Sequence, residues 1–432
     1  MQKAFLIFTF KPHSMSNLVN PLLKKQLFFF VLLFNTIFLA GNCVSAQPQV
    51  AFVQVMQNLS KPIQIRDPND GSNRLFIAQQ AGQIRILKNG VLQPKPFIDL
   101  KNVVKYSTNI GLYSIAFSPD YATSRNFYVL YVSKVLPQTT VLARYKTSAT
   151  NPDSAILNSG VIVLTAQGGS TSGAHTGDLV FGIDGYLYMT LNDGSFYDNT
   201  TSYAQDGTVL FGKMLRINVQ NVNTPPYYTI PADNPFVSSP TIRHEIWATG
   251  LRNGWRWSFD RLTNDMWLAD IGAAQWEEVN FFSPGQSKGA NLGWNCYEGG
   301  TIFNSTGCGN ADSYISPVYA YPHVSATSAE VITGGYVYRG SVYPSLYGYY
   351  LCIDYTTGII YKIKSNGAGG WNAFKQTGGP KNIVSFAETQ SGELYAASLL
   401  GKIYKIVSLT PVPVNKQKPL AIKISAIAQV NR

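Results

Sequence analysis

A strand-like phrase recurs six times along this chain and constrains its fold more than any other feature. Each phrase begins at a turn residue, runs through alternating aromatic and aliphatic positions and often ends on glycine, as antiparallel strands with tight turns do. The phrases are "NRLFIAQQAGQIRIL", "RNFYVLYVS", "GYLYMTLNDG", "NDMWLADIG", "YGYYLCIDYTTGIIYKI" and "GELYAASLLGKIYKI". They predict an all-β fold, a six-bladed β-propeller in which small antiparallel sheets surround a central channel. A β-sandwich with long loops is the alternative, but the last two phrases turn back on themselves, which favours blades.

Composition agrees with this fold. Aromatic residues make up 13% of the 432 residues and charged residues also 13%, with 26 Tyr and 37 Gly, which suits short aromatic strands joined by glycine turns. We expect a signal peptide over residues 1–46, the propeller over 47–407 and a C-terminal tail over 408–432.

The first residues have the pattern of an export signal. Lys24 and Lys25 precede an apolar run from Leu27 to Ala40, and small residues follow up to Ala46. This predicts cleavage after Ala46 and an exported protein, periplasmic or secreted. An uncleaved anchor is the alternative, but the apolar run is short for a bilayer span, so no stable membrane insertion is expected after cleavage.

The net charge of +11 does not indicate a nucleic-acid partner. Residues 1–46 and 408–432 each carry four positive charges and no acids, which leaves +3 for the propeller. No basic patch remains there of the kind that binds nucleic acid.

Three cysteines follow the predicted cleavage point. Cys296 and Cys308 enclose a loop rich in Gly, Asn, Ser and Thr, and an oxidising compartment predicts a disulfide between them. Metal ligation by this pair is the weaker interpretation, because no further ligand lies nearby in the sequence. Cys352 in "YYLCIDY" is expected to be a buried strand residue.

Several phrases occur in the order of a known family. They are "GLYSIAFSPDY", "DLVFGIDGYLYMTLNDGS", "LFGKMLRINV", "HEIWATGLRNGWRWSFD", "WLADIGAAQWEEVN" and "TGGYVYRG". Over roughly residues 50 to 407 the chain resembles the glucose/sorbosone dehydrogenase family, propellers that include soluble aldose dehydrogenases using pyrroloquinoline quinone. The resemblance implies oxidation of a sugar at C1 to a lactone, hydride transfer to that quinone beside calcium, and a separate electron acceptor. The family also contains binding and signalling ectodomains, so a non-catalytic carbohydrate- or protein-binding propeller is the alternative.

Two residues are the candidates for catalysis. His175 in "SGAHTGDLVFG" has the side chain best suited to take a hydroxyl proton near neutral pH, and by resemblance it is the base, although the match needs a one-residue gap. A structural or surface histidine is the alternative. Arg252 in "GLRNGWR" can polarise a carbonyl that becomes an oxyanion and bind carboxylates. Its alternative is an arginine that caps loop carbonyls at a blade junction.

By resemblance, the cofactor would also contact Asn109, Asn253 and Arg339, and the main-chain carbonyls of Gly272 and Ala273 would bind calcium. For Arg339 an ordinary exposed charge at a strand end is the alternative.

Glu277 and Glu278 lie next to each other on an alternating strand. They must therefore face opposite sides, and we expect at least one of them to be solvated.

Departures from the family pattern count against cofactor binding. Ala174 and Ile359 stand where many relatives have polar or basic residues, and each change removes a partner for the cofactor. A calcium-dependent lactonase on the same architecture would need several acidic and Asn ligands at the channel, and the sequence shows no such cluster.

Overall fold

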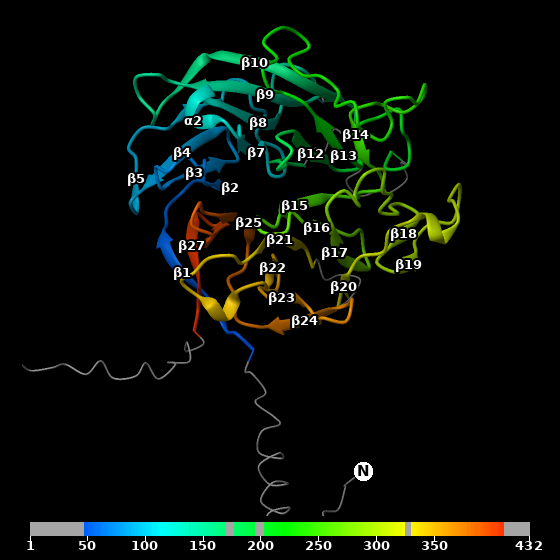
Figure 1. Cartoon of the computed structure of the whole chain (residues 1–432). Coiled ribbons are helices and arrows are strands. Elements are labelled where there is room, and N and C mark those ends of the chain that lie inside the picture. Colours follow the sequence, from blue (N-terminus) through cyan, green and yellow to red (C-terminus); the bar gives the residue numbers. More distant parts are fainter. Residues whose placement is uncertain (1–46, 138, 169–176, 195–202, 325–329, 410–432) are drawn as a thin grey trace, which may run out of the picture. The chain divides into compact units, whose positions relative to one another are not determined.

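The strands of this chain form six antiparallel sheets around a central axis, as a computed structural model shows (Figure 1). The structure describes residues 47–137, 139–168, 177–194, 203–324 and 330–409. Within them, helical segments are limited to α2 (Tyr121–Ser124) and the 3-10 turns η1 (Ala311–Ser313) and η2 (Pro344–Leu346). The predicted all-β, six-bladed propeller is confirmed. The predicted signal peptide lies outside the described residues, as does the tail from residue 410 onward.

Each blade runs from an inner strand beside the channel to an outer strand at the rim. Blade 1 contains β2 (Pro62–Arg66), β3 (Arg74–Gln79), β4 (Gln83–Lys88), β5 (Val91–Leu92) and β6 (Ile98–Asp99). Blade 2 contains β7 (Leu112–Phe117), β8 (Asn126–Val132), β9 (Thr139–Thr147) and β10 (Ala155–Gln167). Blade 3 contains β11 (Gly177–Phe181), β12 (Leu187–Leu191), β13 (Lys213–Ile217) and β14 (Ile246–Ala248).

The other three blades complete the ring. Blade 4 contains β15 (Gly254–Phe259), β16 (Met266–Asp270), β17 (Trp276–Phe282) and β20 (Tyr319–Pro322), and the hairpin β18 (Tyr297–Glu298) and β19 (Thr301–Ile302) follows β17 in the chain. Blade 5 contains β21 (Ile332–Val337), β22 (Tyr350–Asp354), β23 (Ile360–Ser365) and β24 (Trp371–Gln376). Blade 6 contains β25 (Ile383–Glu388), β26 (Leu394–Ser398), β27 (Lys402–Ser408) and β1 (Val50–Met56).

Blade 6 is built from both ends of the described chain. Its outer strand β1 comes from the start and pairs antiparallel with β27, from Val50 opposite Ser408 to Gln54 opposite Tyr404. Backbone hydrogen bonds between the first and last strands therefore close the ring. Strand β27 extends one residue into the region predicted as tail.

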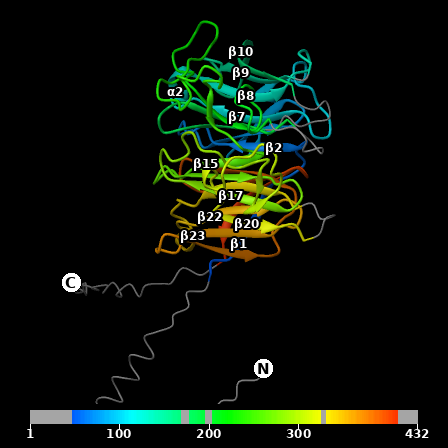
Figure 2. The ribbon, with the colours of Figure 1, turned by 90° about the vertical axis from the view of Figure 1, so that its right-hand side faces the viewer.

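Aromatic side chains fill the space between neighbouring blades. Trp267 of blade 4 stacks on Tyr350 of blade 5 with ring centres 4.5 Å apart, and both residues are buried. Burial of such large side chains contributes about 1.5–3 kcal/mol each and dominates the stability of the ring. Figure 2 shows the blades from the side.

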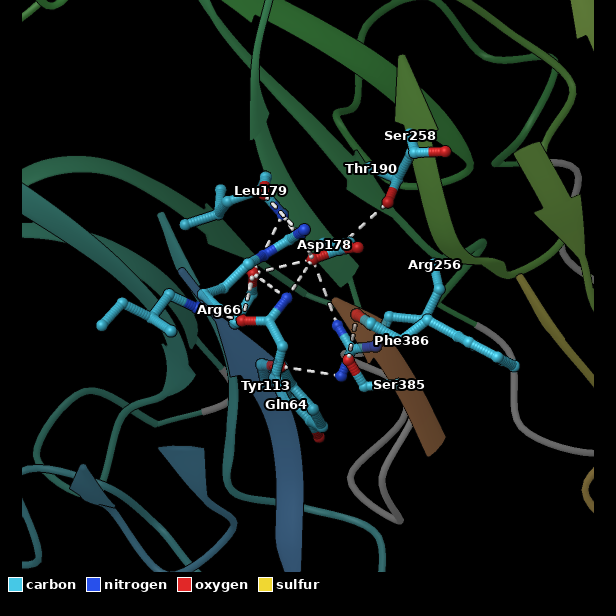
Figure 3. A network of polar contacts seen from close by, with 12 residues as sticks. Gln64, Arg66, Tyr113, Asp178, Leu179, Thr190, Arg256, Ser258, Ser385 and Phe386 are labelled. Atoms are coloured by element: carbon cyan, nitrogen blue, oxygen red, sulfur yellow. Dashed lines mark hydrogen bonds and ion pairs between the residues drawn. The ribbon is translucent and has the colours of Figure 1, made fainter. Parts of the chain in front are cut away.

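A buried polar network closes the middle of the channel (Figure 3). The Asp178 carboxylate on β11 accepts hydrogen bonds from Gln64 (2.7 Å) and Ser114 (2.8 Å) and lies 3.2 Å from Arg66 and 3.1 Å from Arg256. Arg256 lies in a β-bulge between Gly254 and Trp257, which directs its side chain out of the alternating pattern. Its guanidinium also donates to three main-chain carbonyls from other blades.

Candidate functional site

A cavity of about 350 Å³ opens at the end of the channel where the inner strands begin. We call it the entrance pocket. Its wall combines amide and carboxylate side chains with the aromatic residues Tyr113, Trp255 and Tyr355. The volume is typical of a small-molecule site, and such sites combine apolar walls with a few polar groups that orient the ligand.

Arg252 and Asn253 lie in this wall because Asp270 fixes their backbone. The Asp270 carboxylate at the end of β16 accepts the main-chain N–H of Arg252 at 3.0 Å and that of Asn253 at 2.6 Å. Burial raises the pKa of Asp270 to about 7, although the two N–H groups oppose this shift. The loop that carries the predicted pair is therefore clamped to the neighbouring strand.

The Arg252 side chain has one partner and one unsatisfied atom. Nη1 donates to the Ile271 carbonyl at 3.1 Å, and the guanidinium packs over the Trp294 ring at 5.6 Å. Nε is buried and has no hydrogen-bond partner among the described residues. The Trp294 indole N–H donates to Asp193 Oδ2 at 2.7 Å, so this ring links the cation and the carboxylate of the pocket.

Other polar groups of the wall are incompletely paired as well. Gln80 donates through Nε2 to the Thr108 carbonyl at 3.1 Å, but its Oε1, like Oδ1 of Asn192, is buried with no partner in the described part of the chain. Leaving such atoms unsatisfied is costly, and functional sites are where proteins keep them.

The structure brings three of the predicted residues together and leaves Arg339 apart. Asn109, Arg252 and Asn253 line the entrance pocket. Arg339 follows the far end of β21, and its guanidinium pairs with Asp260 at 2.8 and 2.5 Å. Since β21 begins at the pocket, Arg339 lies at the opposite end of the channel and cannot contact a ligand in the pocket.

The predicted calcium ligands Gly272 and Ala273 lie just outside the pocket. Glu298 Oε1 accepts four consecutive N–H groups from Ala273 to Trp276 at 2.7 to 3.2 Å, so this carboxylate fixes the loop. Neither residue belongs to the pocket wall. Within the described ranges no cluster of three His, Cys, Asp or Glu side chains could hold a metal ion.

The expectation that one of the paired glutamates is solvated is wrong. Glu277 is fully buried and accepts hydrogen bonds from His323 Nε2 and the Ile332 N–H, each at 2.9 Å. Glu278 faces the other side and accepts the Gly299 N–H at 2.5 Å. Burial raises the pKa of Glu277 to about 7 and that of Glu278 well above its usual range.

Predictions outside the pocket have mixed outcomes. The disulfide between Cys296 and Cys308 is confirmed, with Cα atoms 5.8 Å apart, and Cys352 is buried in β22 as expected. His175 lies outside the described residues. The next described residue, Gly177, begins inner strand β11.

Residues 59–376 match the Glucose / Sorbosone dehydrogenase family. The chain belongs to this family.

The curated relatives of this chain carry different names and are longer than the region that it matches. The HIPL1 protein of Arabidopsis thaliana is 30% identical over 372 residues, 71% of this chain and 53% of its own. The mouse Hedgehog-interacting protein is 27% identical over 399 residues, 85% of this chain and 53% of its own. This chain thus spans about half the length of these curated relatives. The structure of the PQQ-bound aldose sugar dehydrogenase from Streptomyces coelicolor has a TM-score of 0.63 at 19% identity, over 84% of this chain and 99% of that one, which shows a common fold.

The entrance pocket of this glucose/sorbosone dehydrogenase family member offers few charged partners to a quinone with three carboxylates. Of its described wall residues only Arg252 and Asp193 are charged, and their charges cancel. The internal residues outside the described ranges add no lysine or arginine. Three carboxylates would therefore face one guanidinium and a carboxylate of like charge among the described residues, an arrangement that electrostatic repulsion disfavours.

The sequence did not point to several residues that line the entrance pocket or hold its loops and strands in place. Asp270 lies two residues before the first predicted calcium ligand, Gly272. It is an acid at the end of a buried strand, and this signal could have indicated that it accepts hydrogen bonds there. Gln80 directly follows β3 and lines the pocket. No local signal distinguishes Asp178 or Arg256 from solvated strand residues.

Proposed function

We propose that the entrance pocket binds a neutral sugar. The observation that carries this proposal is the composition of the wall, in which one cation and one anion cancel and carboxamides lie together with aromatic rings. Carboxamide and carboxylate groups pair with neighbouring hydroxyls, and aromatic rings pack against the apolar C–H faces of a sugar ring. The pocket volume of about 350 Å³ accommodates a monosaccharide.

In this proposal Arg252 is the anchor of the ligand. The clamped backbone holds the Arg252 guanidinium and the Asn253 carboxamide in place at the wall. The Asp270 clamp orients these groups before the ligand arrives, so that little entropy is lost on binding.

Oxidation of the sugar at C1 to a lactone, with pyrroloquinoline quinone, calcium and a separate electron acceptor, is the second candidate. It is favoured by the position of Arg252 and Asn253 at the channel end and by the family to which the chain belongs. The base in this reaction would be His175, as the sequence predicts. The charge balance of the pocket is the reason why we place it second.

Calorimetric titration separates the two candidates. We expect monosaccharides to bind the full chain saturably without quinone or calcium, with affinity reduced at least tenfold by Arg252→Ala. Arg243→Ala is the matched control, because this half-exposed arginine lies outside the entrance pocket. If sugars bind only after quinone and calcium are added, and a dye is reduced in a reaction that His175→Ala abolishes, the second candidate replaces the first.

Export after cleavage at Ala46 is part of the proposal. Within the described residues no helix is long and apolar enough to cross a membrane. Detection of the mature chain starting at Gln47 outside the cytoplasm would support export, and an uncleaved chain would contradict it.

A further inference from the structure

A second cavity lies at the other end of the channel, where the inner strands end. It has a volume of about 460 Å³ and receives residues from all six inner strands, including Arg66 of β2, Tyr336 of β21 and Glu388 of β25. It shares no wall residue with the entrance pocket, and the Asp178 network is buried between them. A neighbouring hollow of about 190 Å³ shares Gly182, Ile183, Phe259 and Asn264 with it, so the two adjoin. We call the two adjoining cavities together the far groove.

Three consecutive inner strands end in a partly exposed phenylalanine at this groove. Phe117 ends β7, Phe181 ends β11 and Phe259 ends β15. Each ring is fixed by aromatic contacts, for example Phe117 with Phe76 at 4.6 Å and Phe259 with Tyr188 at 5.4 Å. The row therefore offers rigid apolar surfaces at a place where soluble proteins usually cover such rings.

The arginines of the groove each contact an acidic side chain. Arg66 contacts Asp178, and Arg261 contacts Glu388 at 3.1 Å. In the adjoining hollow Arg216 contacts Asp184 at 2.9 Å and Asp233 at 2.8 Å. A charged ligand would compete with these pairs, and the largely buried pair of Arg66 with Asp178 is costly to break. The groove therefore favours a neutral ligand.

Two side-chain amides in the groove lack partners. Those of Asn69, after β2, and Asn264, after β15, make no hydrogen bond within the part of the chain that the structure describes. Both residues have positive φ, 56° and 61°, a backbone conformation that asparagine tolerates and that holds each in its turn. A carboxamide both donates and accepts, as a pair of neighbouring hydroxyls requires.

From these observations we infer that the far groove binds a neutral oligosaccharide. Sugar rings pack on the row of phenylalanines, while their hydroxyls pair with the two asparagine amides. The groove extends into the adjoining hollow, so it suits several linked sugars rather than one. A peptide that binds by adding a strand is less suitable, because the groove wall consists of strand ends and turns rather than a sheet edge.

The test uses neutral tetrasaccharides, namely maltotetraose, cellotetraose and xylotetraose, titrated calorimetrically into the full chain. The double variant Asn69→Gly and Asn264→Gly removes both amides, and glycine adopts the same positive φ without strain. We expect at least one tetrasaccharide to bind, and the double variant to weaken that binding at least tenfold. Asn89→Gly is the matched control, since Asn89 has φ 51° and lies in neither cavity. It should bind like the parent chain.

Arg252→Ala distinguishes this inference from the proposed function. Tetrasaccharide binding that survives Arg252→Ala but not the double asparagine variant supports the far groove. If Arg252→Ala abolishes it and the double variant does not, the entrance pocket binds these sugars and the inference about the groove is overturned. It is equally overturned if no tetrasaccharide binds, or if only a neutral tetrapeptide of Gly, Ser and Asn binds in a manner sensitive to the double variant.

Discussion

Replacing Asp178 by alanine should destabilise the propeller strongly, because two buried guanidiniums share its Oδ1. Arg66 lies 3.2 Å and Arg256 3.1 Å from that atom, and the Arg256 side chain is 4% exposed. Burial already lowers the pKa of Arg256 to about 10, which shows how poorly its charge is solvated. Removing one partner of a buried pair costs about 3–5 kcal/mol, since the remaining charge is left uncompensated.

The expected loss converts into a measurable change in the melting temperature. At about 2.1 cal/mol/K of unfolding entropy per residue, a loss of about 4 kcal/mol lowers the Tm of a propeller of this length by about 5 °C. Asp178→Asn keeps the shape and part of the hydrogen bonding, so it should give a smaller loss. Scanning calorimetry and urea unfolding at pH 7 measure both variants.

Asp233→Ala is the matched control. Asp233 also pairs with an arginine that is 4% exposed, Arg216, but the Asp233 side chain itself is 61% exposed. Exposed pairs contribute about 0–1 kcal/mol, so the control should shift the Tm by no more than about 1 °C. Equal shifts in Asp178→Ala and Asp233→Ala, or a loss below about 1 kcal/mol for Asp178→Ala, would refute the view that Asp178 stabilises the two guanidiniums that share it.

Three further perturbations test other parts of the molecule. Replacing both Cys296 and Cys308, 12 positions apart, by serine should lower the free energy of unfolding in urea by about 3 kcal/mol through the entropy of the opened loop; an unchanged midpoint would contradict this. Burial raises the pKa of Glu388 to about 7, so folding favours its protonated form. The stability that this contributes is present at low pH and is lost as the pH rises from about 4.5 through 7. Urea unfolding across that range should show a smaller decline in the free energy of unfolding for Glu388→Gln than for the parent chain. Asp270→Ala should weaken sugar binding in the entrance pocket at least tenfold in calorimetry and leave the far groove unaffected, whereas an equal loss at both sites would indicate general unfolding.

The blades could be predicted because their signal is local. Alternation with a period of two and glycine turns appear within each phrase, for instance around Cys352, and require no knowledge of distant residues. Asn109, Arg252 and Asn253 were anticipated because the family resemblance places them at one end of the channel.

The remaining features depend on contacts that alternation does not encode. The pattern at Glu277 and Glu278 indicates that the two face opposite sides, but not that His323 and the hairpin containing Gly299 cover both. For Arg339 the sequence shows a strand end without showing at which end of the channel that strand ends. Arg256 escaped notice because the bulge in β15 shifts the alternation by one residue.

The pairing of β1 with β27 has a consequence for how the chain matures. Cleavage after Ala46 would leave three residues before Val50, the first residue of β1. A protease that cut a few positions later would remove part of β1, whose pairing with β27 joins the first strand to the last. The ring also cannot close until β27 has been synthesised. During synthesis β1 therefore has no pairing partner until nearly the whole polypeptide has been made.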